Sequence, residues 1–322
     1  MTLVAVVVVS LGACGSPTAG SSPTPRPTAS PSAPLVSSSP TRIPMPTQTV
    51  LSAPSDALLW AEVGDAVLYR STDRGDNWTE VNLPVPTHEI TFADAYHGWL
   101  LGPASPATQC QSESVDLRAT SDGGVTWQKM QPHGIASAQC KESLSFTDAS
   151  HGFVGAWDDN GPPVIYRTAD GGSTWRSSAP LADPPGWASH PGGWELRTGP
   201  VHAFGTALLV TVTNNVGQTY VYRSADGGAN WSYYRTLPAS GGYPGFATAE
   251  RWLILAIPGQ SQETTDGGST WHRSTSDYNQ AAPVAPAITF ADAMVGYATV
   301  RGAIQRTVDG GQHWSTISTP GT

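Results

Sequence analysis

One short pattern, S/T-x-D-x-G-x-x-W, occurs six times along this sequence, and it limits the possible folds of the chain more than any other feature. Successive copies begin 40 to 56 residues apart. A period of that length is typical of solenoids and propellers, in which each repeat forms one small unit that packs on its neighbours. The aspartates of the six copies are Asp73, Asp122, Asp170, Asp226, Asp266 and Asp309, and the tryptophans are Trp78, Trp127, Trp175, Trp231, Trp271 and Trp314.

The segments between the copies have the pattern of short β-strands. A second phrase, such as ITFADAYHGWLLG at 90–102 and ITFADAMVGYATV at 288–300, precedes some copies, and alternating runs such as YVYRS at 220–224 lead into them. These runs are rich in Val, Ile and Tyr and are bounded by Gly and Asp, and no segment has a sustained helical period. The sequence therefore predicts an all-β, six-bladed β-propeller over residues 51–322. Each blade would have four antiparallel strands, the fourth starting at the Trp.

The repeated aspartate is predicted to shape a turn and not to act in catalysis. A carboxylate can accept backbone N–H groups across a tight loop, and the glycines supply left-handed backbone conformations. The Trp at the end of the pattern can then fold back onto the sheet and bury a large apolar area. A catalytic group is needed once in a site, whereas this aspartate recurs in every blade, so the pattern indicates a structural role.

The first 50 residues differ in composition and are predicted to lie outside the propeller. Residues 1–13 form an apolar run that is too short to span a bilayer as a helix. The tetrapeptide that ends at Cys14 resembles a bacterial lipobox, so we expect a lipoprotein signal peptide at 1–13 and a lipid on Cys14. The alternative is an ordinary secretory signal or a buried segment. Residues 14–50 hold nine of the 28 prolines among many Ser and Thr, which predicts a disordered tether.

Two further cysteines, Cys110 and Cys140, complete the cysteine content. An exported domain meets an oxidising environment, where an even pair of cysteines usually forms a disulfide. Neither cysteine lies in a CxxC pair or beside a His/Cys cluster, so no metal site is predicted, and the sequence indicates no cofactor. A bridge would close a loop of about 30 residues and add roughly 3–4 kcal/mol to stability.

Strand order assigns the loops to two faces of the propeller. The turns with the repeated aspartate share one face with the turns between first and second strands, and the remaining loops lie on the opposite face. Both cysteines map to that opposite face, as does a long insertion at 180–200. Long loops in compact folds are often functional, and exposed aromatic and charged groups suit a peptide or a sugar. The predicted partner-binding residues are Trp187, His190, Trp194, Glu195 and Arg197, with Asp158 and Asp159 from a neighbouring loop; the alternative is that the tryptophans cap the propeller.

The repeated pattern resembles the BNR or Asp-box repeat of sialidases, sortilin-type receptors and photosystem II stability/assembly-factor-like propellers. The combination of F-x-D-A-x-x-G with DGGxTW is most similar to the last group, which is also found among exported proteins of non-photosynthetic bacteria. The resemblance covers about residues 51–322. It implies the propeller fold, but it says little of function, because the motif belongs to the turn and not to a site.

An enzyme is the alternative that the resemblance raises. Sialidases carry an Arg-Ile-Pro near their first strand, and this chain has one at 42–44. Such enzymes also need two more arginines for the substrate carboxylate, a Tyr–Glu nucleophile pair and an acid/base Asp. The sequence offers Glu195, Glu250 and Glu263 without a Tyr in an evident partner position, and Asp56 and Asp65 in no recognisable pattern.

The sequence favours a non-enzymatic propeller that acts as a binding or assembly scaffold, with a sialidase-type exo-glycoside hydrolase as the alternative. We expect a monomer, exported and anchored through Cys14 to the outer face of the bacterial cell membrane, with a protein or glycan partner. The net charge of −9 without a basic stripe argues against nucleic acid as a partner. Two points of ring construction stay open: the first blade could lack its first strand, or residues 46–53 could close the ring by pairing with the last blade.

Overall fold

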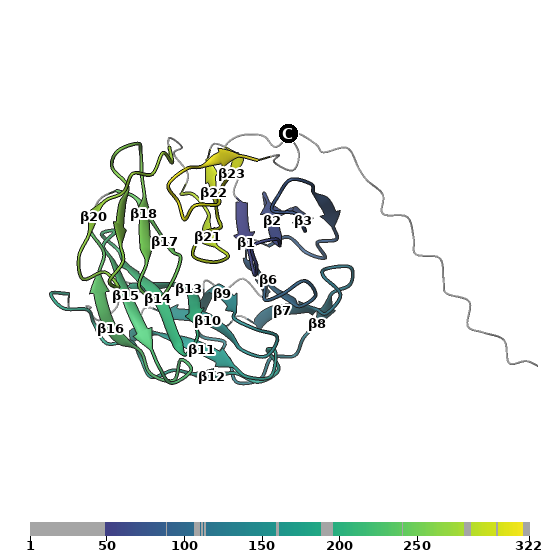
Figure 1. Ribbon diagram of the computed structural model, residues 1–322. Coiled ribbons are helices and arrows are strands. Elements are labelled where there is room, and N and C mark those ends of the chain that lie inside the picture. Colours follow the sequence, from purple (N-terminus) through teal and green to yellow (C-terminus); the bar gives the residue numbers. More distant parts are fainter. Residues whose placement is uncertain are drawn as a thin grey trace, which may run out of the picture. The chain divides into compact units, whose positions relative to one another are not determined.

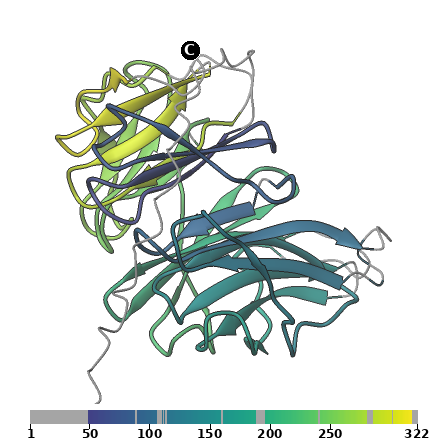
Figure 2. The same ribbon diagram turned by 90° about the vertical axis from the view of Figure 1, so that its right-hand side faces the viewer.

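A computed structural model describes residues 49–317 apart from 88, 106–109, 111, 113, 159–160, 188–195, 240, 280–284 and 301. These residues form six four-stranded antiparallel sheets, each built from four strands that are consecutive in the sequence. Figure 1 shows the sheets arranged as blades around a central axis, and Figure 2 gives the view turned by 90°. The predicted all-β, six-bladed propeller is confirmed. The predicted signal peptide, Cys14 and most of the predicted tether lie outside the described residues.

Strands β1 to β12 form the first three blades in chain order. Blade 1 consists of β1 (Thr49–Ser52), β2 (Leu59–Val63), β3 (Val67–Ser71) and β4 (Thr79–Val81). Blade 2 consists of β5 (Glu89–Phe92), β6 (Gly98–Ser105), β7 (Ser114–Thr120) and β8 (Gln128–Lys129). Blade 3 consists of β9 (Cys140–Phe146), β10 (Gly152–Asp158), β11 (Gly161–Thr168) and β12 (Arg176–Ser177).

The last three blades repeat this order. Blade 4 consists of β13 (Leu196–Phe204), β14 (Ala207–Asn214), β15 (Thr219–Ser224) and β16 (Ser232–Thr236). Blade 5 consists of β17 (Tyr243–Phe246), β18 (Trp252–Leu255), β19 (Gln262–Thr264) and β20 (His272–Arg273). Blade 6 consists of β21 (Ile288–Phe290), β22 (Gly296–Val300), β23 (Ala303–Thr307) and β24 (Ser315–Thr316). Within the described residues, no helix has the length and apolar character needed to cross a bilayer.

The ring closes between blade 6 and blade 1 without an exchanged strand. β1 pairs with β2 of its own blade, with Thr49 opposite Val63. Blade 1 therefore has its own first strand, and residues 49–52 do not serve to complete the last blade. Side chains join the two blades instead: a shared apolar cluster lies between them, and the Arg306 guanidinium donates to the Arg74 carbonyl oxygen at 2.7 Å.

The strand boundaries differ from the sequence prediction in three ways. Each fourth strand begins one residue after the Trp, because the Trp still belongs to the turn. β9 begins at Cys140 and so extends into the segment between blades 2 and 3, since this strand continues along β10 past an irregularity in its register. β13 begins at Leu196 because it pairs with the long β14, so residues 196–200 of the insertion, with Arg197, are strand and not loop.

The Asp box forms the same turn in every blade. In blade 3 the Asp170 carboxylate accepts the Thr174 N–H at 2.8 Å and the Thr168 hydroxyl at 2.8 Å, and the Gly172 N–H donates to that hydroxyl at 3.0 Å. Hydrogen bonds from the hydroxyl and the N–H of Thr174 are the main reason why the pKa of the Asp170 carboxyl is lowered to about 2. The corresponding bonds from backbone N–H groups to the aspartate recur at Asp73, Asp122, Asp226, Asp266 and Asp309. The turn therefore occupies these carboxylates.

The Asp boxes lie on the same face of the ring as the turns between first and second strands, which agrees with the assignment made from strand order. A backbone hydrogen bond joins the two turns within a blade, as from the Gly171 N–H to the Ser150 carbonyl oxygen at 2.9 Å. Asp148 of the second phrase accepts the N–H groups of Ser150 and His151, and its carboxylate lies 2.8 Å from Nδ1 of the His151 ring. Both turns are thus held by aspartates.

The second phrase also determines how neighbouring blades pack. In blade 3 the Phe146 ring lies on Gly152, where a Cβ atom would overlap the ring. Phe146 also stacks on Trp99 of blade 2, with ring centroids 3.7 Å apart. Trp60 of blade 1 stacks in the same way on Phe92 of blade 2, at 4.0 Å. The glycine of the phrase therefore permits a close ring contact at the boundary between blades.

Gly152→Ala is expected to lower the free energy of unfolding by about 1–3 kcal/mol, because the added methyl group must displace the Phe146 ring. Gly161→Ala is the matched control, since a Cβ there meets no atom within 4 Å and its backbone is not left-handed. Urea unfolding of the two variants measures the difference. Equal stability of both would show that the ring contact does not require glycine.

Candidate functional site

The face opposite the Asp boxes carries the disulfide of the described chain. Cys110, in the loop between β6 and β7, is bonded to Cys140 at the start of β9, with their Cα atoms 4.6 Å apart. The bridge is the one that the sequence predicts, and it ties blade 2 to blade 3. Of the predicted partner-binding residues, Trp187, Arg197 and Asp158 are described, whereas Asp159, His190, Trp194 and Glu195 lie outside the described residues.

Arg197 and Trp157 form a cation–π pair on this face. The guanidinium carbon of Arg197 lies 4.3 Å from the centroid of the Trp157 ring, where the positive charge meets the negative face of the π-system. Burial raises the pKa of the nearby Glu142 carboxyl, and Arg197 and Trp157 offset part of that rise. Arg197 is exposed, and Trp157 and Glu142 are half-buried. Three strands thus bring a cation, an indole and a carboxyl together.

The first part of the 180–200 insertion is held against the propeller. Leu181 is fully buried in the apolar core between blades 3 and 4, and Trp187 packs against the same core. The Tyr222 hydroxyl donates to the Ala182 carbonyl oxygen at 2.5 Å. Trp187 therefore lies against the core, and Trp194, the other tryptophan of the insertion, lies outside the described residues. Asp158 lies opposite Gly161 at the end of β10.

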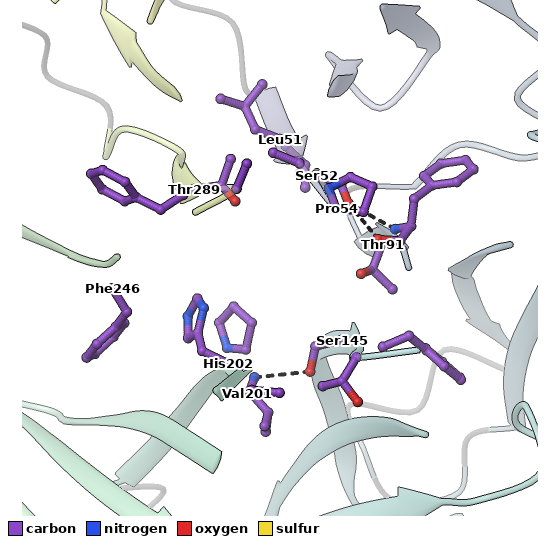
Figure 3. Close-up of a pocket in the computed structure, with 18 of the residues that line it drawn as sticks. Leu51, Ser52, Pro54, Thr91, Ser145, Val201, His202, Phe246 and Thr289 are labelled. Atoms are coloured by element: carbon purple, nitrogen blue, oxygen red, sulfur yellow. Dashed lines mark hydrogen bonds between the residues drawn. The ribbon is translucent and has the colours of Figure 1, made fainter. Parts of the chain in front are cut away.

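A cavity of about 520 Å³ lies on the axis of the ring, lined by residues from the first strands of all six blades. Figure 3 shows this cavity with side chains around it. Two buried serines in its wall join neighbouring first strands: Ser52 Oγ accepts the Phe92 N–H at 2.9 Å, and Ser145 Oγ accepts the Val201 N–H at 3.0 Å. These bonds hold blade 1 to blade 2 and blade 3 to blade 4 at the axis.

Backbone donors bind both oxygens of Glu89 and one oxygen of Asp292, the two carboxylates among the described residues of the cavity wall. The two oxygens of Glu89 accept the N–H groups of Ser143 and Leu144, each at 2.9 Å. Asp292 Oδ1 accepts two N–H groups of its own turn, each at 2.7 Å. No Arg, Lys or Tyr is among the described residues that line the cavity. The described part of the axis thus holds no arginine cluster that could bind a substrate carboxylate.

The carboxylates considered for the enzyme alternative have other surroundings. The Glu263 carboxylate lies 2.6 Å from Arg251 Nε, and Asp56 pairs with Arg74 of the first Asp box. In the described part of the chain, no group of His, Cys, Asp and Glu side chains is large enough for a metal site. Glu250, Glu263, Asp56 and Asp65 do not line the axial cavity, and Arg42 and Glu195 lie outside the described residues.

The sequence did not single out two titratable groups that the structure makes unusual. Glu62 of β2 is fully buried, and neither carboxylate oxygen makes a hydrogen bond of ordinary geometry. His202 of β13 lines the axial cavity, where burial lowers the pKa of its imidazole to about 4. Glu62 has a sequence signal, because it lies in the otherwise apolar strand LWAEV. His202 has none, because no repeated phrase marks the start of blade 4.

Residues 71–235 match the family model of the photosynthesis system II assembly factor YCF48. That stretch is slightly more than half of the chain. The chain belongs to this family. Membership agrees with the resemblance that the Asp boxes and the F-x-D-A-x-x-G phrases indicate. No curated protein matches the sequence.

Solved structures place this YCF48-family chain among propellers of several kinds. YCF48 from Cyanidioschyzon merolae is 16% identical with a TM-score of 0.50, over 86% of this chain and 87% of that one. The GH74 enzyme of Niastella koreensis is 15% identical with a TM-score of 0.52; the match covers 83% of this chain but only 46% of the enzyme. The SapL1 lectin in complex with alpha methyl fucoside is 11% identical with a TM-score of 0.55, over 87% and 97%. At these identities the likeness shows the fold alone.

Proposed function

We propose that this propeller is a non-enzymatic, monomeric scaffold that binds or assembles a protein or glycan partner. In this proposal the protein is exported and is held at the outer face of the cell membrane by a lipid on Cys14. One observation carries the non-enzymatic part: Glu89 and Asp292 of the axial cavity each accept two backbone N–H groups. Oxygens that already accept backbone N–H groups are less available to a substrate proton or to an attacking water.

The proposed partner surface is the face opposite the Asp boxes. Arg197 is exposed and lies over the Trp157 ring, and side chains of these two types often provide much of the binding energy at interfaces. The family name describes an assembly factor, and the SapL1 lectin of similar fold is named in complex with a fucoside. Both partner classes therefore have support, and the shared fold of the GH74 enzyme keeps a glycosidase as the alternative.

Binding is tested with the full-length protein on arrays of immobilised glycans and extended peptides. Arg197→Ala is expected to weaken the strongest interaction about tenfold or more, because it removes the exposed cation from the Trp157 ring. Arg273→Ala, at an exposed position on the outer strand β20, is the matched control and should bind like the wild type.

Enzyme activity is measured on the same preparations with fluorogenic sialosides and arabinofuranosides. Binding that depends on Arg197, without turnover, is the expected result. Clear turnover would overturn the scaffold proposal and favour the glycosidase. If Arg197→Ala and wild type bound the partner equally well, the partner surface would not include Arg197, and the proposed surface would be wrong.

A further inference from the structure

We propose that the axial cavity is a second binding site, which takes a neutral, hydroxyl-rich ligand of about the size of a mono- or disaccharide. The cavity volume of about 520 Å³ is within the range of small-molecule sites, roughly 300–1,000 Å³. The site is distinct from the surface with Arg197 and Trp157. It does not depend on the function proposed for that surface.

Three polar side chains from three blades face this cavity and have no hydrogen-bond partner among the described residues. They are Thr91 of β5, His202 of β13 and Thr289 of β21, and Figure 3 shows them around the hollow. Each is partly accessible, whereas the wall serines Ser52 and Ser145 are buried and hydrogen-bonded to neighbouring strands. The wall therefore contains two sets of polar groups. One set joins the blades, and the other is available to a ligand.

The available groups offer hydrogen bonds but no charge. Burial lowers the pKa of the His202 imidazole to about 4, so the ring is neutral near pH 7 and supplies one donor and one acceptor. Each threonine hydroxyl can donate and accept. Backbone N–H groups already occupy both oxygens of Glu89 and one oxygen of Asp292, and the described wall has no Arg or Lys. An anionic ligand would be desolvated here without an available counter-charge, which is costly.

Apolar surface lies next to these polar groups. The centroid of the Phe246 ring is 5.0 Å from that of the His202 ring, and Val50 and Ile288 also line the cavity. A purely apolar ligand would leave the hydroxyls of Thr91 and Thr289 desolvated and unpaired, at a cost of about 1–3 kcal/mol for each group. A saccharide presents hydroxyl groups and C–H surface together, so it can satisfy both parts of the wall.

The proposal is tested by calorimetric titration of the full-length protein with maltose, cellobiose and N,N′-diacetylchitobiose. At least one of these disaccharides is expected to bind with a Kd of about 1 mM or tighter. The double variant Thr91→Val/Thr289→Val keeps the shape of the wall and should weaken that binding roughly tenfold, because two hydroxyl hydrogen bonds are lost. Thr79→Val, on the exposed outer strand β4, is the matched control and should have no effect.

Four outcomes would overturn the proposal. The first is that none of the three disaccharides binds the folded protein. The second is binding that the double variant leaves unchanged. The third is binding that only Arg197→Ala removes. This result would place the sugar on the surface with Arg197 and Trp157 and would leave the scaffold proposal intact. The fourth is tighter binding of anionic sialyllactose or of a neutral Gly-Ser peptide than of any of the disaccharides.

Discussion

Glu62→Gln is expected to raise the free energy of unfolding by about 3–5 kcal/mol above pH 8 and to change it little at pH 4. Glu62 is fully buried on β2, on the same side of the strand as Trp60, whose ring stacks on Phe92 of blade 2. Burial raises the pKa of the carboxyl from 4.5 to about 8, and the Asp65 carboxylate adds to this rise. The N–H groups of Asp65 and Ala66 offset only part of it. The folded protein therefore keeps a proton on Glu62 at neutral pH.

The sign of the pH dependence follows from the raised pKa. The unfolded chain releases this proton near pH 4.5, whereas the folded protein keeps it until about pH 8. Ionisation therefore stabilises the unfolded state between these values, by about 1.4 kcal/mol for each pH unit. The wild type should lose stability across this window. Glutamine has almost the same shape and does not ionise, so the variant should not show this loss.

Urea unfolding at a series of pH values between about 4 and 9 measures the effect. Glu80→Gln, at an exposed position on β4 of the same blade, is the matched control and should keep the pH dependence of the wild type. If wild type and Glu62→Gln gave parallel stability profiles, Glu62 would not be protonated in the folded protein, and the interpretation would be wrong.

Removal of the disulfide by Cys110→Ser and Cys140→Ser is expected to lower the free energy of unfolding by about 3–4 kcal/mol. The two cysteines are 30 residues apart in sequence, so the bridge removes a large amount of conformational freedom from the unfolded chain. In the folded protein, hydrogen bonds from the N–H groups of Ser143 and Leu144 to Glu89 also join blade 3 to blade 2. Those bonds remain in the double variant, so we expect a less stable propeller and not an unfolded one.

Thermal unfolding with and without a phosphine reductant measures this contribution. The reductant should lower the melting temperature of the wild type to that of the double variant, and it should leave the double variant unchanged. Both proteins carry the same Cys14, so any effect of this residue cancels. Equal melting of the oxidised wild type and the double variant would contradict the predicted stabilisation.

The fold could be predicted from the sequence because the contacts that define its turns join residues close together in the sequence. Asp170 bonds to groups within four residues of itself, and Phe146 packs on a glycine six residues further along the chain. A short segment of sequence therefore contains all the residues that form each turn, and repetition of that segment along the chain produces the blades. The disulfide was predicted from the even pair of cysteines in an exported domain, and strand order places both cysteines on one face of the ring.

The candidate site was only partly predictable. The sequence selected Arg197 and Trp187 as parts of one loop. In the structure Arg197 belongs to strand β13, and Trp187 packs against the core between blades 3 and 4. The partner of Arg197, Trp157, lies on another blade and was not selected at all. Contacts of this kind depend on how one blade sits against the next, which no local pattern reports.

The sequence by itself determined the turns, the four strands of each blade and the number of blades, since each copy of the repeat encodes its own turn and sheet. Only the tertiary structure decided what faces the axis. Thr91, His202 and Thr289 lie on three different blades, and their neighbours in sequence do not distinguish them from Ser52 or Ser145. A hydroxyl on a first strand bonds to the next blade or remains open to the cavity according to the register between blades. That register is set by packing between residues far apart in sequence, such as Trp99 on Phe146.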